Sequence, residues 1–103
     1  MGGNRRYPEH GEKLREEREL RDAAKAGPLQ SLTPEQLALH AHPLTVAPER
    51  HQPITRAWLR FGTTDVRVTV RACRWTDHAV GIETRIHNHV LRAWVWRGAV
   101  DPW

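Results

Sequence analysis

The C-terminal half of this chain is constrained above all by a strict alternation of apolar and polar residues. The alternation occurs in four stretches, residues 54–61, 65–72, 78–86 and 90–97. Successive side chains of a β-strand point to opposite faces, so each stretch predicts a strand with one apolar and one polar face. The residues predicted to face the core are Thr55, Ala57, Leu59, Phe61, Val66, Val68, Val70, Ala72, Val80, Ile82, Thr84, Ile86, Leu91, Ala93 and Val95.

Short turns separate these stretches. Gly62-Thr63-Thr64-Asp65 suits a hairpin turn, and residues 100–103 add either a fifth short strand or a single turn. Strands so few and so short bury a core only by curling closed. We therefore expect a mainly β (α+β) fold, a small antiparallel barrel of four or five strands with an N-terminal helical extension.

The order of helix, strands and turns over residues 33–103 resembles an SH3-like small barrel, in particular its Sm-like version. The resemblance implies the fold alone. Sm-like RNA binders carry a turn motif with uridine-contacting residues, which Gly62-Thr63-Thr64-Asp65 does not reproduce, so ring assembly and uridine binding are not implied. Residues 75–80 and 93–96 also resemble small uncharacterised proteins of high-GC bacteria and their phages or plasmids, which implies no function.

The first half of the chain predicts two helices and a connector. Residues 12–26 favour a helix in composition and place opposite charges at helical spacing. Thr33-Pro34-Glu35-Gln36 forms a capping box with proline at the first helical position, which predicts a short helix over 34–40. Prolines hold residues 42–53 extended, as a connector to the strands.

Charge divides the chain at the same place. Residues 1–52 carry eight basic and eight acidic side chains, whereas residues 53–103 carry eight basic and four acidic ones. The net charge of +4 therefore lies in the β half. We expect residues 1–30 to be a flexible arm and a charged helix, and residues 31–103 to hold the capped helix, the connector and the barrel.

Composition excludes several classes of protein. No apolar run approaches the roughly 18 residues that span a bilayer, and the first 20 residues lack the apolar block of a signal peptide. We therefore expect a cytoplasmic protein with no membrane partner. The single Cys73 excludes an internal disulfide and a multi-cysteine zinc site. A lone cysteine on a strand is a packing residue rather than a nucleophile, so we expect no catalysis.

The candidate binding surface is the polar side of the first and last predicted strands. Its residues are Arg56, Trp58, Arg60, Arg92, Trp94 and Trp96. If the two strands are neighbours in a closed barrel, these side chains share one surface. Tryptophan stacks on bases and arginine contacts phosphate, which suits single-stranded nucleic acid. Exposed tryptophans equally suit a protein partner, a second copy of the chain, or burial beneath the N-terminal helices.

Histidine is abundant, with seven residues. Two His-x-His pairs, in residues 40–42 and 87–89, have a spacing that a metal ion can use, and His51 or His78 could add a third ligand. No cysteine or carboxylate pattern completes a site. We therefore expect no metal and no cofactor.

Together these patterns indicate a non-catalytic binding or accessory module. We expect it to recognise a protein partner or to assemble with itself, and to be encoded by a bacterium or its mobile elements. The alternative is a single-stranded nucleic-acid-binding protein that uses the arginine and tryptophan face.

Overall fold

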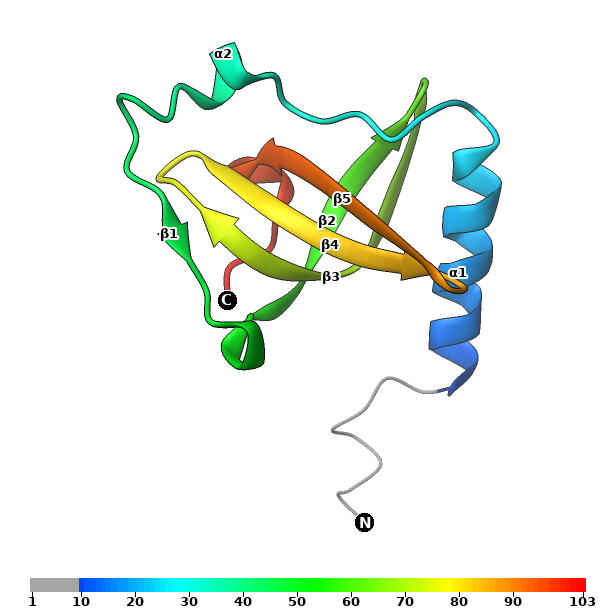
Figure 1. Cartoon of the computed structure of the whole chain (residues 1–103). Helices are drawn as coiled ribbons and strands as arrows, with labels where there is room; N and C mark the ends of the chain where they lie inside the picture. Colours follow the sequence, from blue (N-terminus) through cyan, green and yellow to red (C-terminus); the bar gives the residue numbers. More distant parts are fainter. Residues whose placement is uncertain (1–9) are drawn as a thin grey trace.

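The computed structural model describes residues 10–103 of the 103-residue chain. Its elements, shown in Figure 1, are in chain order α1 (His10–Ala24), α2 (Pro34–Leu37), β1 (Thr45–Val46), the 3-10 turn η2 (Glu49–His51), β2 (Ile54–Phe61), β3 (Thr64–Trp75), β4 (Ala79–Ile86), β5 (His89–Trp96) and the 3-10 turn η3 (Arg97–Ala99). The part of the predicted arm that precedes residue 10 lies outside the described residues. Within residues 10–103, no helix combines the length and apolar character needed to cross a lipid bilayer.

The strands form one antiparallel sheet around the long strand β3. β2 pairs with residues 64–71 of β3, and β4 pairs with residues 71–75. The short strand β1 pairs with the last two residues of β3, and β5 pairs with β4. A bulge between Ala72 and Arg74 shifts the register and bends β3. The four predicted strands are confirmed. β1 is an additional strand, inside the predicted connector. Directly after it, Ala47 donates its N–H to the carbonyl of Cys73 at the bulge, which holds the connector against β3.

The core lies on the inner face of the sheet and follows the predicted alternation in β2 and in β3, whereas in β4 all four residues from Ala79 to Ile82 are buried, so the alternation predicted there is wrong. In β2 every second residue from Thr55 to Phe61 is buried, and the residues between them are exposed. Val66, Val68 and Val70 repeat this pattern in β3. Each large apolar side chain buried in this way contributes about 1.5 to 3 kcal/mol, so the inner face is the main source of stability.

Helix α1 packs beside the first part of β3, along the strand edge that is not paired with β4. Leu20 and Ala23 lie in the core. The Glu16 carboxylate accepts hydrogen bonds from the Thr69 backbone N–H (3.0 Å) and hydroxyl (3.1 Å). Pairing with β4 begins only at Arg71, so Glu16 satisfies a strand-edge N–H that β4 does not reach.

Two glycines allow the end of α1 to meet the β2–β3 turn. Gly62 has a φ of +58°, and a Cβ there would lie 2.3 Å from the carbonyl oxygen of Ala26. A Cβ on Gly27, where φ is +152°, would lie 3.2 Å from the Gly62 Cα. This contact turns the chain out of the helix, which ends at Ala24 rather than at the predicted residue 26.

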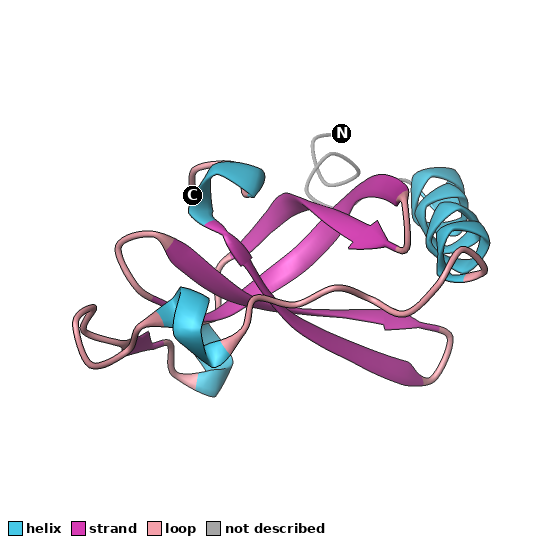
Figure 2. Cartoon of the chain, turned by 90° about the horizontal axis from the view of Figure 1, so that it is seen from above, coloured by secondary structure: helices cyan, strands magenta, loops and turns pink. Residues whose placement is uncertain are grey.

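The mainly β class and the N-terminal helix are confirmed, but the sheet is open. Among the residues that the structure describes, no ladder joins β2 to β5. The linker after α1 crosses between these strands instead (Figure 2). Gln30 donates its N–H to the carbonyl of Arg60 (2.8 Å), and Leu32 donates to the carbonyl of Trp94 (2.9 Å). The linker thus occupies edge carbonyls that closure of a barrel would use.

The shorter elements follow the predicted turn chemistry closely. In α2, the Thr33 hydroxyl accepts from the Gln36 N–H and the Gln36 amide oxygen accepts from the Thr33 N–H, which confirms the capping box. The helix stops at Leu37 because Ala38 is left-handed, with φ of 47°. After β5 the chain forms the turn η3 and a single bridge between Val100 and Ala57.

Candidate functional site

Outward side chains stand in rows across β3, β4 and β5. One row is Arg71, Glu83 and Arg92, and the next row is Arg74, Gly81 and Trp94. Opposite residues of antiparallel strands lie about 5 Å apart, so the two rows form one continuous surface. We call this surface the arginine groove and define it by Arg71, Arg74, Arg85, Arg92 and Trp94.

The arginine groove is an open concavity of about 860 Å³. Its rim includes Ser31 from the linker and Glu49 and Gln52 from the connector. Gly81 lies buried in it, and a Cβ there would lie 2.9 Å from the Arg74 Cγ. The missing side chain at Gly81 therefore lets the aliphatic part of Arg74 lie flat across β4.

The guanidinium groups of the groove are mostly without carboxylate partners. Arg92 donates to the Glu83 carboxylate at 3.0 Å. Within residues 10–103, Arg71, Arg74 and Arg85 form no ion pair. The guanidinium groups of Arg71, Arg74 and Arg85 are thus free to donate hydrogen bonds to an anionic ligand.

Cys73 lies in the same groove at the bulge of β3. Burial raises the pKa of its thiol, and the Glu83 carboxylate raises that pKa further against the opposing effect of nearby arginines. A raised pKa keeps the sulfur protonated at neutral pH, and only the thiolate is a strong nucleophile. The local environment therefore does not activate Cys73.

The outer surface of β2 and of the first half of β3 also carries arginines, but the charges of these arginines are compensated by carboxylates. Here each of three arginines has a carboxylate partner: Arg56 with Glu16, Arg60 with Asp65, and Arg67 with Asp101. We call these three arginines and their partners the paired face. The hydrogen bond from Arg67 holds the pKa of Asp101 below its ordinary value.

The structure distributes the six predicted site residues over several places. Arg92 and Trp94 lie in the arginine groove. Arg56 and Trp58 line a second concavity, of about 540 Å³, against the acidic side of α1. Arg60 lies on the paired face.

Trp96 lies elsewhere, with its ring centroid 5.6 Å from that of His78. The six residues therefore do not line one concavity. The prediction omitted Arg71, Arg74 and Arg85, although the alternation of their strands already pointed Arg71 and Arg85 outward.

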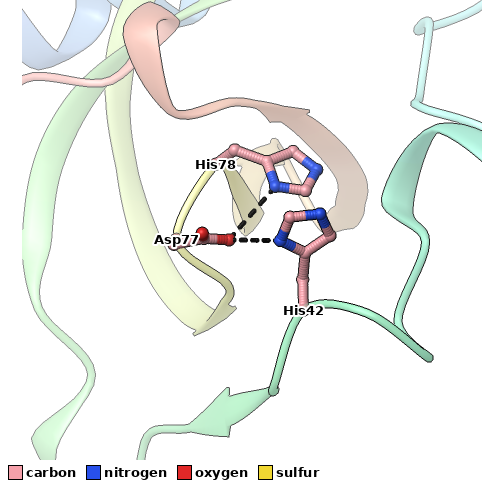
Figure 3. A group of neighbouring side chains, drawn as sticks. All are labelled: His42, Asp77 and His78. Atoms are coloured by element: carbon pink, nitrogen blue, oxygen red, sulfur yellow. Dashed lines mark hydrogen bonds and ion pairs between the residues drawn. The ribbon is translucent and has the colours of Figure 1, made fainter.

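Neither predicted His-x-His pair forms a ligand cluster as a pair within residues 10–103. His40, His51, His87 and His89 are exposed. His42 instead lies beside Asp77 and His78, with a 3.9 Å separation of the two imidazole centroids (Figure 3). Hydrogen bonds from His78 and then His42 lower the pKa of Asp77. The sequence indicated both histidines as possible ligands but not the carboxylate, whose only signal is its position next to His78.

Comparison with protein-family models, with curated proteins and with solved structures finds no match to this chain.

Proposed function

We propose that this chain is a cytoplasmic, non-catalytic binding module that holds single-stranded nucleic acid in the arginine groove. The observation that carries the proposal is the set of unpaired guanidiniums on one concave surface. Arg71 and Arg74 come from β3 and Arg85 from β4, and none has a carboxylate partner in the described part of the chain.

The composition of the groove favours nucleic acid over a small anion. Arg71 and Arg92 lie two strands apart, about 10 Å, which is a distance that suits successive contacts along an extended backbone. Trp94 is half-buried beside them and offers an indole on which a base can stack. Stacking on an aromatic ring is worth about 1 to 3 kcal/mol per base.

The proposal is tested by fluorescence anisotropy with a labelled single-stranded oligonucleotide at several salt concentrations. The groove variant is Arg71→Gln with Arg85→Gln, and the matched control on the paired face is Arg56→Gln with Arg60→Gln. We expect the groove variant to bind at least about tenfold more weakly. Its slope of log affinity against log salt should fall by about 0.7 for each phosphate that it no longer neutralises. Equal effects of the two double variants, or binding indifferent to salt, would contradict the proposal.

A protein partner or self-association is the second candidate, and exposed apolar side chains favour it. Val46, Ile54 and Trp58 are 60%, 62% and 51% exposed on β1 and β2. Such side chains usually mark an interface when they lie together. Light scattering after size exclusion, over a range of concentrations, tests self-association. A mass that rises with concentration in the wild type and not in Ile54→Ser/Trp58→Ser would support it.

A further inference from the structure

Three potential metal ligands converge at the end of the molecule away from α1. His42 comes from the loop after α2, and Asp77 and His78 come from the turn between β3 and β4. The Asp77 Oδ1 lies 2.7 Å from His42 Nδ1 and 3.2 Å from His78 Nδ1. Figure 3 shows both rings turned toward the carboxylate. One ligand atom from each residue lies within 4.8 Å of the others.

Hydrogen bonds fix the backbone that carries these ligands. The buried Thr76 hydroxyl accepts from the N–H groups of His78 (3.3 Å) and Ala79 (3.1 Å). Arg97 donates its N–H to the His78 carbonyl at 2.8 Å. In the other segment, His42 donates its N–H to the Ala38 carbonyl at 3.1 Å. The two segments are thus preorganised independently of the side chains that meet between them.

The hydrogen bonding of the His78 ring leaves a place for a cation. Its Nε2 lies 3.3 Å from the carbonyl oxygen of Gln36, which only accepts, so Nε2 carries the hydrogen. Nδ1 is then the ring nitrogen that faces the Asp77 Oδ1, and a metal ion bound by both atoms would take the place of the hydrogen between them.

We propose that His42, Asp77 and His78 form a binding site for a divalent transition-metal cation, with Zn²⁺ as the probe. Two imidazole nitrogens and one carboxylate oxygen are ligands that Zn²⁺ takes, whereas Mg²⁺ and Ca²⁺ prefer oxygen alone. Bonds of about 2.0 to 2.2 Å require ligand atoms somewhat over 3 Å apart, which small side-chain rotations provide here. The Asp77 side chain is 72% exposed, so water can complete the coordination.

The contact between His78 and Gln36 fits this role. Metal-binding histidines usually donate their other ring N–H to a carbonyl or carboxylate, which fixes the ring. The ion would fasten the loop after α2 to the β3–β4 turn. This role is independent of nucleic-acid binding in the arginine groove.

Isothermal titration of ZnCl₂ into the untagged, chelator-treated full chain at pH 7.5 tests the proposal. We expect one site, and a melting temperature raised by about 10 °C at a hundredfold excess over Kd. His42→Gln and Asp77→Asn should each weaken this binding by at least about tenfold. The control is His87→Gln with His89→Gln, which removes the exposed His-x-His pair and should bind as the wild type does.

Folding of each variant is checked by circular dichroism and by melting without metal. The proposal is overturned if the wild type binds no Zn²⁺, or if binding survives in His42→Gln and is lost in the control. Nitrogen-15 spectra of the histidines show whether the Nδ1 of His78 binds the metal ion. A shift of the His78 Nδ1 resonance on adding Zn²⁺, with the hydrogen kept on Nε2, supports the metal site, and an Nδ1 resonance that does not change in excess Zn²⁺ overturns it.

Discussion

The paired face and the arginine groove are built from the same kind of strand yet differ in charge. Both place arginine at outward positions of alternating strands. On the paired face each arginine has a carboxylate partner, whereas among the groove arginines only Arg92 has one within residues 10–103. One surface is neutralised and the other remains cationic.

The origin of the carboxylates explains the difference. Asp65 lies opposite Arg60 on the neighbouring strand, so the hairpin register alone creates that pair. Glu16 comes from α1 and Asp101 from the segment after η3, so tertiary packing creates the other two pairs. A row of arginines on a strand therefore stays cationic only where no other element brings a carboxylate to it.

Both surfaces depend on the inner face that they share, and Val68→Asp should destroy them together. Val68 is fully buried, and an unpaired buried charge costs about 3 to 5 kcal/mol. We expect the variant to be unfolded or to melt far below the wild type in a circular dichroism scan. Ile54→Asp, at an exposed position of β2, is the control and should melt close to the wild type. A cooperative transition of Val68→Asp at the wild-type temperature would contradict this account of the core.

Trp94→Ala tests whether the indole of Trp94 contributes to binding or to the stability of the fold. If a base stacks on this indole, its removal lowers affinity for single-stranded nucleic acid by about tenfold or more. Trp58→Ala, in the second concavity, is the matched control and should leave that affinity unchanged. Stability is followed by urea unfolding. A loss of several kcal/mol in Trp94→Ala would mean that the indole is structural, and the stacking role would then be wrong.

Glu16→Ala removes one of the three carboxylates of the paired face. The Glu16 carboxylate accepts two hydrogen bonds from Thr69 and pairs with Arg56 at 3.7 Å. We expect a loss of about 2 kcal/mol in the free energy of unfolding, measured with urea. Glu19→Ala, an exposed glutamate of the same helix, should lose much less. Equal losses would show that the helix needs no specific interaction with the β3 edge.

Asp101→Asn tests the paired face through pH. The folded-state pKa of Asp101 lies below its ordinary value of 3.8 because of the hydrogen bond from Arg67, so ionised Asp101 stabilises the fold above that value. This stability is lost as pH falls below 3.8 through the folded pKa. Urea unfolding at pH 7 and pH 3 should show a smaller acid loss in Asp101→Asn than in the wild type. Glu35→Gln serves as the control, and a matching change in that variant would refute the assignment.

Much of the fold could be predicted from local pattern. The alternation around Ala57 and Val68 decided which face is buried, because a strand's side chains alternate by geometry alone. The capping box at Thr33 decided where α2 begins, since its partners lie within one turn. Local pattern was thus enough to predict the four long strands, the buried faces of β2 and β3 and the start of α2.

Contacts between distant segments decided the rest. The shortness of the strands predicted a closed barrel. The sheet is instead open, because Gln30 and Leu32 of the linker form hydrogen bonds to the carbonyls at its edges. Without closure, the six predicted site residues divide between different surfaces. The arginine groove and the meeting of His42 with Asp77 likewise depend on which segments pack together. Such juxtapositions form only when the chain packs, because they join residues so far apart in the sequence that no periodic pattern links them.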